Sequence, residues 1–361
     1  MLRGIETFYK GKKVFLTGHT GFKGSWLLFW LKSMGAEVKG YSLNPLSEKD
    51  LYNQMGGENL CQSVIADIRD SERLENELLA FEPDLVFHLA AQPLVLLSYE
   101  EPELTYETNV LGTGYLLKAI RKLNKPCAVI LITTDKVYEN REWVYPYREN
   151  DPLGGYDPYS SSKAACEILI NSYRQSFFNP KLFDSHKKAI AVARAGNVIG
   201  GGDWSENRII PDIIRALQSN QKIIVRNPNA VRPWQHVLEP LGGYLLLGKR
   251  LYEEPLRFCE AWNFGPYLTD TFTVSALVKK AINIWGSGEI SNAETKSVLH
   301  EAGLLKLDIS KVASVLNWYP KLNCNLAIEK TITWYKSAAY KKTAELMAND
   351  ISDYLAIANE E

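Results

Sequence analysis

The chain holds few of the residues that build disulfide frameworks or metal centres. Its five cysteines are scattered along 361 residues, and no two of them form a CxxC pair. An odd number of isolated cysteines argues against paired disulfides and against a zinc site, so no bound metal is expected. The thiols are expected to be buried bystanders in a reducing, cytoplasmic setting.

The chain also lacks an excess of charge of one sign and any long apolar run. Its 41 basic residues nearly balance 42 acidic ones, whereas a dedicated nucleic-acid surface needs a basic excess. The apolar run at 26–31 is too short to cross a bilayer, and the polar N-terminus does not resemble a signal peptide. We therefore expect a soluble protein without nucleic-acid or membrane partners.

What the chain does hold is an alternation of apolar strands and helical stretches. Strands are predicted at 13–17, 37–43, 63–66, 85–89, 128–132 and 189–193, and helices at 25–34, 72–80, 111–123 and 158–178. Nearly continuous apolar strands separated by helices are typical of a parallel sheet covered on both faces. The sequence therefore predicts an α/β fold built on a Rossmann-type doubly wound parallel sheet.

The alternation weakens after Gly196, where glycine, proline and tryptophan become frequent. Helical patterns return at 275–284 and from 326 to the end. With 46% hydrophobic residues, the chain is long enough for two domains with a sizeable core. We predict a Rossmann domain at 1–196, to which 233–262 returns, and a smaller C-terminal α/β substrate lobe at 197–232 and 263–361.

A glycine-rich loop joins the first predicted strand to the first predicted helix. Residues 18–24 read Gly-His-Thr-Gly-Phe-Lys-Gly, a GxxGxxG pattern. Glycines let the backbone turn sharply and approach a pyrophosphate, and the helix N-terminus then offers free N–H groups. The pattern predicts a dinucleotide site, with a tight structural turn as the alternative. The predicted cofactor-binding residues of this loop are Gly18, Thr20, Gly21, Phe22, Lys23 and Gly24.

The ends of the second and third predicted strands indicate which dinucleotide binds. Residues 41–44 hold neither an acid for the ribose nor an arginine for a 2′-phosphate. We expect Ser42 to contact NAD, with NADP as the alternative because Lys49 follows closely. Asp67, next to Ile68, is placed to accept a hydrogen bond from an adenine amino group. A helix-capping or loop aspartate is the alternative for Asp67.

Two short runs hold groups suited to acid–base chemistry. Tyr159 and Lys163 are four residues apart, so they share one face of the predicted helix. A neighbouring ammonium favours the tyrosinate, which lowers the pKa of the phenol and lets it accept a proton from a substrate hydroxyl. The run 133–136, Thr-Thr-Asp-Lys, adds a hydroxyl, a carboxyl and an amine at the end of a buried strand. A surface pair beside an ordinary strand end is the alternative.

Together these motifs resemble the extended short-chain dehydrogenase/reductases, the NAD-dependent epimerase/dehydratase family. The resemblance rests on the glycine loop, Asp67-Ile68, the run 88–91, Asn109, Thr134 and the YxxxK pair. Within the family, the chain is similar to the 4,6-dehydratases of the CDP-glucose branch at 88–95, 133–138, 194–204 and 232–238. Members of the dTDP-glucose branch instead hold Asp-Glu after the threonine.

The resemblance implies a lyase of deoxysugar biosynthesis, of the kind that serves O-antigen lipopolysaccharide. Hydride would leave carbon 4 of the sugar for NAD, water would be lost across carbons 5 and 6, and hydride would return to carbon 6. The expected partner is a small-molecule sugar nucleotide, CDP-glucose. Another 4,6-dehydratase or a 4-epimerase of the family is the alternative, as is a scaffold that binds the cofactor without turnover.

The same resemblance assigns expected roles. Tyr159 would be the base for the 4-hydroxyl, Thr134 would hydrogen-bond that hydroxyl, and Lys163 would bind the nicotinamide ribose. Asp135 is the expected acid for the leaving hydroxyl, provided that burial raises its pKa. Lys136 is either a neutral base for the carbon 5 proton or an electrostatic stabiliser of the enolate, with a solvated loop lysine as the alternative.

Further contacts and an assembly follow from the resemblance alone. The expected cofactor contacts are Leu89, Ala90, Ala91 and Asn109. The expected substrate contacts are Gln92, Asn197, Arg208 and Arg232. The rigid fork of arginine suits phosphate, although a surface ion pair is the alternative for each arginine. The helices at 111–123 and 159–178 are expected to form a homodimer.

Overall fold

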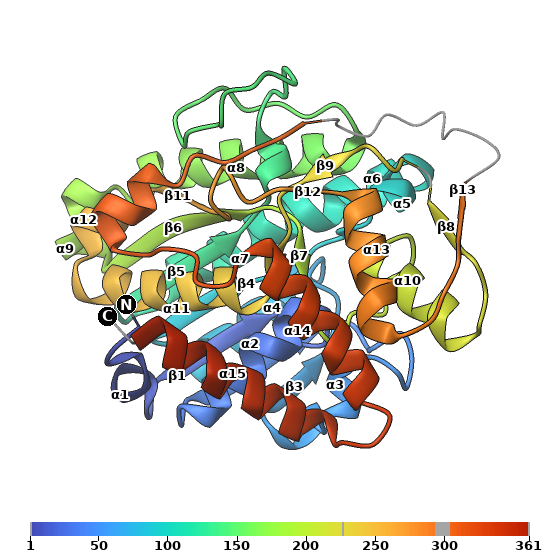
Figure 1. Ribbon diagram of the computed structural model, residues 1–361. Helices are drawn as coiled ribbons and strands as arrows, with labels where there is room; N and C mark the ends of the chain where they lie inside the picture. Colours follow the sequence, from blue (N-terminus) through green and yellow to red (C-terminus); the bar gives the residue numbers. More distant parts are fainter. Residues whose placement is uncertain (1, 226, 293–303, 360–361) are drawn as a thin grey trace.

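A central sheet of seven parallel strands organises the molecule (Figure 1). The computed structural model describes residues 2–225, 227–292 and 304–359. The strand order is β11-β6-β5-β4-β1-β2-β3. The strands are β1 Lys13–Thr17, β2 Glu37–Ser42, β3 Gln62–Ile65, β4 Leu85–His88, β5 Cys127–Ile132, β6 Lys188–Ala195 and β11 Ala261–Phe264. The predicted α/β fold with a doubly wound parallel sheet is confirmed.

Alternate residues of each central strand enter two separate cores. In β5, Ala128, Ile130 and Ile132 belong to one core, while Val129 and Leu131 belong to the other. Successive side chains of a strand point to opposite faces, so a strand that is buried on both sides must be apolar throughout. This requirement explains the uninterrupted apolar runs that made these strands predictable.

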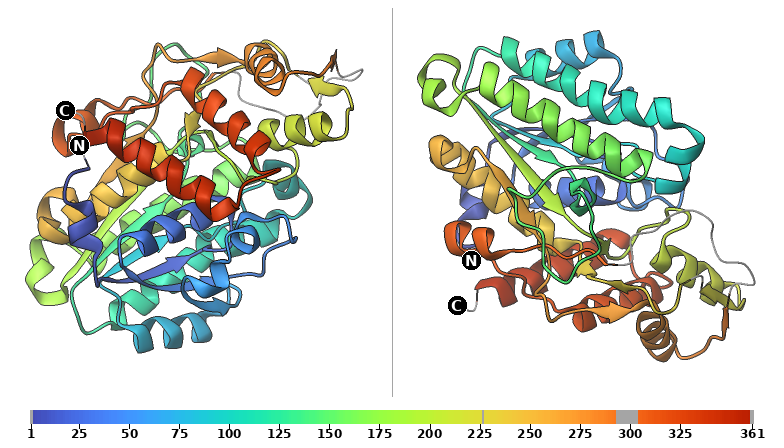
Figure 2. Two further views of the ribbon diagram at one scale, coloured as in Figure 1. Left: turned by 60° about the horizontal axis from the view of Figure 1, so that its bottom comes forward. Right: turned by 90° about the horizontal axis from the view of Figure 1, so that it is seen from above.

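Helices cover both faces of the sheet. One face carries α4 Ser71–Phe81, α7 Gly112–Lys122 and α8 Pro158–Ser176. The other carries α2 Phe22–Ser33 and α11 Leu238–Glu253, and Figure 2 shows α14 Cys324–Ser337 and α15 Thr343–Asn359 outside them. Shorter helices connect these layers: α1 Ile5–Tyr9, α3 Leu51–Gln54, α5 Val95–Glu100, α6 Pro102–Tyr106, α9 Phe183–His186 and α12 Pro255–Phe258. In the described part of the chain, no helix is long and apolar enough to span a bilayer.

Short strand pairs form the smaller part of the molecule. The pairs are β7 Val198–Ile199 with β10 Gln235–His236, β8 Ile223–Val225 with β13 Ile290–Asn292, and β9 Val231–Arg232 with β12 Phe272–Thr273. Two helices accompany them, α10 Ile209–Gln218 and α13 Val274–Trp285. The pairs β8–β13 and β9–β12 join segments before α11 to segments beyond it, whereas β7 and β10 both precede α11. The domain limits proposed from the sequence stay a prediction.

The sequence pattern predicts no helix at 238–253, yet α11 occupies this range and is almost wholly buried. The helix contains glycines that read as helix breakers in a sequence. A Cβ on Gly243 would overlap with the ring of Phe264, and one on Gly248 would lie 2.5 Å from the Tyr9 hydroxyl. The glycines therefore let α11 lie close to the sheet and to α1, and that tertiary packing outweighs their poor helix propensity.

Glu239, near the start of α11, is a buried carboxyl that holds the C-terminal region to this helix. Its Oε1 accepts hydrogen bonds from the backbone N–H groups of Lys321 at 2.8 Å and Leu322 at 2.5 Å. Its Oε2 accepts one from the hydroxyl of Tyr354, on α15, at 3.0 Å. Burial raises the pKa of Glu239 from its ordinary 4.5 to about 7, against the opposing effect of the two backbone hydrogen bonds.

We expect this carboxyl to make the protein less stable as the pH rises. The folded state binds the Glu239 proton more tightly than the unfolded state does, so its contribution is complete below the unfolded pKa and is lost as the pH rises through about 7. The loss is about 3 kcal/mol at most. Denaturant unfolding of wild type and Glu239→Gln at about pH 5 and about pH 8 should show the variant gaining relative stability at the higher pH. Glu206→Gln, at an exposed carboxyl, is the control. If the free energies of unfolding of wild type and Glu239→Gln differ by the same amount at both pH values, the expectation is contradicted.

Candidate active site

The candidate site lies at the carboxyl ends of the parallel strands, where the strand order reverses. β1 pairs with β2 on one side and with β4 on the other, so the chain winds away from β1 in both directions. The loops after β1 and β4 therefore diverge. Ligands of open α/β sheets usually bind in the crevice between such loops.

The glycine loop is tightly packed at two of its glycines and open at the third. Gly18 has a φ of 74°, and a Cβ there would lie 2.7 Å from the backbone nitrogen of Ala90. A Cβ on Gly24 would overlap with the Gly18 oxygen, so only glycine lets α2 begin this close to the turn. Around Gly21 the nearest atom would be 3.5 Å away, and no side chain caps the N-terminus of α2. The loop thus fits a pyrophosphate, which needs uncapped N–H groups around an open backbone.

The structure brings Thr20 and Ser42 together at the end of β2. The Thr20 hydroxyl lies 2.8 Å from the Ser42 hydroxyl and donates to the Leu43 carbonyl at 2.9 Å. Phe22 is half-buried, and its ring lies 3.2 Å from where a Cβ on Gly200 would be. Residues predicted to hold the cofactor therefore link the glycine loop to β2 and to the smaller part of the molecule.

The run that follows β4 is anchored by a threonine that the sequence interpretation missed. Thr17 accepts hydrogen bonds from the N–H groups of Leu89 and Ala90, both at 3.1 Å. Its hydroxyl also lies 2.7 Å from Nδ1 of the buried His88. Leu89, Ala90 and Ala91 are only half-buried, so they line the crevice beside the glycine loop. Thr17 ends an ordinary apolar strand, so nothing local distinguished it.

Asp67 is held within its own loop. Its carboxylate accepts hydrogen bonds from Arg69, through the backbone N–H at 2.8 Å and the guanidinium at 2.7 to 3.1 Å. These hydrogen bonds lower the pKa of Asp67. Arg69 also pairs with Glu107 at 3.0 Å, and Ile68 is buried. The Asp67 carboxylate is thus bonded within its own loop, as in the alternative of a loop aspartate. Its contact with adenine stays a prediction.

Asn109 and Gln92 contact each other rather than open space. The Asn109 Oδ1 accepts from the Gln92 N–H at 2.9 Å, and its Nδ2 donates to the Gln92 carbonyl at 3.1 Å and to Ser162 at 2.9 Å. The Gln92 amide donates to Thr105 at 2.8 Å and to the Leu94 carbonyl, and accepts from the Leu94 N–H. Both side chains are buried. Their predicted contacts with cofactor and substrate stay predictions. In this structure both side chains hold the loop after β4 in place.

Four of the five predicted catalytic side chains meet at the end of β5. The Thr134 hydroxyl donates to the Asp135 carboxyl at 2.9 Å and also hydrogen-bonds Tyr159. The Lys136 Nζ lies 5.8 Å from the centre of the Tyr159 ring, so the lysine is not a remote surface group. Lys163 is buried one turn further along α8. The catalytic roles stay predictions, but the geometry they require is present.

Burial dominates the protonation of this cluster. It raises the pKa of Asp135, as an acid at neutral pH requires, even though the Lys136 charge and the Thr134 hydrogen bond lower it. Burial also raises the pKa of Tyr159 to about 12, against the Thr134 hydrogen bond. In this structure burial outweighs the lowering of the Tyr159 pKa that was expected from Lys163, and the role of Tyr159 as the base stays a prediction. Burial lowers the pKa of Lys163 itself, against the opposing effects of Cys166 and Glu167.

Lys23 projects beneath the glycine loop toward the catalytic cluster. Its Nζ donates to the hydroxyl of Tyr244, on α11, at 3.4 Å. Burial and then the Arg208 charge lower the pKa of Lys23 to about 8, and the charges of Asp135 and Lys163 also act on it. Lys23 was predicted as a cofactor contact, and its side chain also lies at the bottom of the candidate site, within reach of the charges of Asp135 and Lys163.

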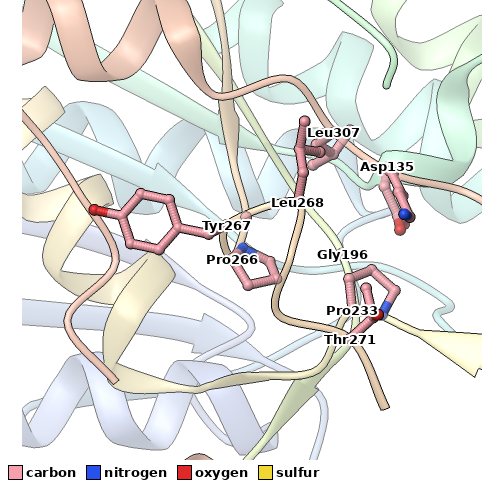
Figure 3. A pocket seen from close by; sticks show the side chains of 10 residues that line it. Asp135, Gly196, Pro233, Pro266, Tyr267, Leu268, Thr271 and Leu307 are labelled. Carbon is pink, nitrogen blue, oxygen red and sulfur yellow. The ribbon is translucent and has the colours of Figure 1, made fainter. Parts of the chain in front are cut away.

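A cleft opens beside Asp135, and the predicted substrate residues are not among its lining residues, although Asn197 and Arg232 directly adjoin Gly196 and Pro233, which line it. Arg208 pairs with the buried Asp203 at 3.2 Å, and the Arg232 charge acts on Asp135. The Asn197 carbonyl accepts from the Gln235 N–H at 3.1 Å, and Asn197 itself is half-buried. Figure 3 shows the cleft with Asp135 and Gly196 toward one side and Pro266 and Tyr267 toward the other. Its remaining lining residues are Pro233, Gly265, Leu268, Thr271, Lys306 and Leu307.

Most of the cleft lining was missed by the sequence interpretation. Gly265 and Pro266 directly follow β11, so they lie at the same carboxyl edge as the catalytic groups. Recognising Ala261–Phe264 as a strand would have pointed to them. No set of His, Cys, Asp and Glu side chains in the described ranges is arranged to ligate a metal ion.

Comparison with known proteins gives concordant results. Residues 15–331 match the family described as GDP-mannose 4,6 dehydratase. The chain is 48% identical over 354 residues to CDP-glucose 4,6-dehydratase of Salmonella typhimurium, covering 97% of this chain and 98% of that protein. UDP-glucose 4-epimerase of Thermotoga maritima, solved with UDP-glucose, superposes with a TM-score of 0.76 at 22% identity, over 91% of this chain and 99% of that one. dTDP-glucose 4,6-dehydratase of Bacillus anthracis, solved with NAD, superposes with a TM-score of 0.74 at 20% identity, over 92% and 100%. The two solved structures confirm the fold.

Proposed function

Because the chain belongs to the GDP-mannose 4,6-dehydratase family of extended short-chain dehydrogenase/reductases, we propose that it is a CDP-glucose 4,6-dehydratase. The observation that carries the proposal is the buried Asp135 carboxyl. It has a raised pKa and lies between Thr134 and Lys136, beside Tyr159. A 4-epimerase needs the tyrosine, the lysine and the threonine, but it needs no acid and base for elimination. The near full-length similarity to a CDP-glucose 4,6-dehydratase supports the same choice.

The cofactor in this proposal is NAD. The open Gly21 and the uncapped start of α2 would hold its pyrophosphate, and Ser42 and the run after β4 would hold its remaining parts. When bound, NAD would supply the hydride acceptor for carbon 4 of the sugar and the hydride donor for carbon 6. The residues Ser42–Asn44 include no basic side chain for a 2′-phosphate, which favours NAD over NADP.

The protein side chains move the protons. Tyr159 would accept the proton of the 4-hydroxyl, with the positive charge of bound NAD opposing the effect of burial on the Tyr159 pKa, and Thr134 would hydrogen-bond the same hydroxyl. Burial favours the protonated form of Asp135, which would donate its proton to the departing 6-hydroxyl. Lys136 acts on the proton of carbon 5, either as the base or through its charge. The proposal includes a cytoplasmic location, where a nucleotide-sugar substrate and a dinucleotide cofactor are both available.

Substrate turnover tests the proposal. Purified protein with NAD and CDP-glucose should form a 4-keto-6-deoxy product, which is read by its absorbance in alkali. We expect kcat/KM for CDP-glucose to exceed the values for dTDP-, UDP- and GDP-glucose roughly tenfold or more, because a hydrogen-bonding pocket rejects the wrong base. Formation of CDP-galactose without a keto product would show an epimerase. No turnover of any nucleotide sugar would overturn the proposal.

Two substitutions separate the possible roles of Lys136. If Lys136 is the base, both Lys136→Ala and Lys136→Arg should slow exchange of the carbon 5 proton with solvent about 100-fold or more. If it stabilises the enolate by charge, Lys136→Arg should keep most of the exchange while Lys136→Ala loses it, because arginine is always charged and is no base. The exchange is followed by deuterium incorporation. Wild-type exchange in Lys136→Ala would exclude both roles.

The proposed enzyme is a homodimer. The outer face of η2 (Glu107–Leu111) and α8 exposes large apolar side chains, with Leu111 49% and Ile168 61% exposed. Ile168→Glu should shift the protein to monomers in sedimentation velocity, because dimerisation would bury the charge. Leu182→Glu is the matched control, since Leu182 is also 61% exposed but lies outside these helices. A wild-type monomer, or a dimer that Ile168→Glu leaves intact, would contradict this assembly.

A further inference from the structure

The turn that presents Asp135 and Lys136 is fastened at both ends to the same buried ion pair. At its entrance, the Thr133 hydroxyl donates to Oε1 of Glu167 at 2.6 Å. At its exit, the Tyr138 hydroxyl accepts from Nη1 of Arg194 at 2.7 Å. Between these anchors runs one 3₁₀ turn, Asp135–Val137. The predicted elimination groups therefore project from a short segment whose two ends are fixed.

The ion pair itself is rigid and almost fully withdrawn from water. The Arg194 Nε donates to both Glu167 oxygens, at 2.8 and 3.0 Å, and its Nη2 also contacts Glu167 Oε2. Both side chains are only 4% exposed. Arg194 Nη1 has a further acceptor in the Glu149 carbonyl at 3.0 Å. Buried charges are tolerated when they are paired and hydrogen-bonded in this way, and the bidentate geometry fixes their orientation.

The same carboxylate belongs to the helix that carries the predicted redox pair. Tyr159, Lys163 and Glu167 follow one another at four-residue spacing in α8. Residues at this spacing lie on one face of a helix. Glu167 thus joins the face that holds Tyr159 and Lys163 to the turn that holds Asp135 and Lys136.

The Tyr138 anchor extends the connection to β11. Its hydroxyl donates to Oδ1 of Asn263 at 2.7 Å, and Nδ2 of Asn263 donates to the carbonyls of Tyr147 and Asp308. The Tyr138 ring lies 4.9 Å from the Arg194 guanidinium and stacks on Tyr147, with centroids 5.0 Å apart. Removal of the Tyr138 hydroxyl would therefore break its hydrogen bonds to Arg194 and Asn263 and leave the ring in place.

We propose that the Glu167–Arg194 ion pair is a positioning element. It holds the turn that carries Asp135 and Lys136 at a fixed position relative to the face of α8 that carries Tyr159 and Lys163, and we call this fixed position the register of the turn. The proposal rests on the proposed dehydratase function. Glu167, Arg194, Thr133 and Tyr138 act through the residues they hold. Asp135 and Lys136 of the turn serve elimination, whereas hydride transfer uses Tyr159 of α8 and Thr134, which precedes the turn; displacing the turn should therefore slow elimination more than hydride transfer.

Removal of one hydroxyl at each anchor tests this register. In Thr133→Val and Tyr138→Phe, hydride transfer to NAD should stay near the wild-type rate. Elimination should slow roughly tenfold or more, because small displacements of reacting groups carry large rate penalties. Reduced cofactor should then accumulate on the enzyme in single turnovers, and Asp135→Asn gives the reference trace for lost elimination. Thr133→Ser keeps the donor and should restore the wild-type trace.

Tyr147→Phe is the matched control, because Tyr147 belongs to the same ring stack but its hydroxyl contacts Asn140 and the Arg141 N–H rather than the ion pair. Thermal unfolding of each variant establishes that it is folded before its kinetics are compared. If the anchor variants behave like Tyr147→Phe, or if all steps slow by one common factor, the register role is overturned. If the wild type turns over no sugar nucleotide, the dehydratase proposal fails instead, so the two failures are distinguishable.

Discussion

The parallel register of β4, β5 and β6 is the constraint on which the rest of the site depends. His88 lies opposite Leu131, and Ile132 lies opposite Ala193, so the three strands end at nearly one level. The Thr133 N–H continues the ladder by donating to the Ala193 carbonyl at 2.9 Å. The next residues of β5 therefore leave the sheet at a defined height and direction. A slip of one residue would turn every side chain of the strand to the opposite face.

The same register explains why Gly196 follows β6. A Cβ at this position would lie 2.9 Å from Oδ2 of Asp135. The absent side chain leaves room for the carboxyl at the edge of the cleft. The position of the Asp135 carboxyl therefore depends both on the register of the strands and on the glycine at position 196.

Burial then determines the charge of the cluster. Desolvation disfavours every charged form, so it acts in opposite directions on acids and on bases. It raises the pKa of Asp135 and Tyr159, and it lowers the pKa of Lys163 and Lys23. The charged forms of these four side chains are therefore all disfavoured, acids and bases alike. In such an environment, a change of charge on one member has a large effect on the others, because little water is present to screen it.

The fold was largely predictable because its signals are local. The apolar runs of the central strands follow from their burial on both faces, and the glycine loop follows from backbone geometry that few other residues can adopt. Helix α11 was missed because its glycines serve contacts with Phe264 and Tyr9, which are distant in the sequence. β11 was missed with it, and so was the cleft lining that follows β11.

The site was predictable as a set of residues but less so as a set of interactions. The spacing of Tyr159 and Lys163 correctly placed them on one helix. It could not reveal that burial outweighs the charge of Lys163 in setting the Tyr159 pKa, because burial is a property of the whole fold. Likewise, Asp67 as a hydrogen-bond acceptor was a sound inference from its position after a strand, but its pairing with Arg69 depends on the conformation of the loop. The contact of Glu167 with Arg194 joins residues 27 positions apart and leaves no periodic pattern in the sequence.

The 3₁₀ conformation of the turn after Thr134 bears directly on the chemistry of elimination. Successive side chains of a 3₁₀ helix point about 120° apart, because the helix has three residues per turn. Asp135 and Lys136 are successive, so their side chains leave the turn in different directions. Asp135 lines the cleft beside Gly196, while the Lys136 amine lies near the Tyr159 ring. Loss of water across two neighbouring carbons needs an acid at one and a base or cation at the other. In the proposed reaction, a single tight turn supplies both groups from adjacent residues, at different angles, beside Tyr159, the proposed base for the neighbouring carbon 4.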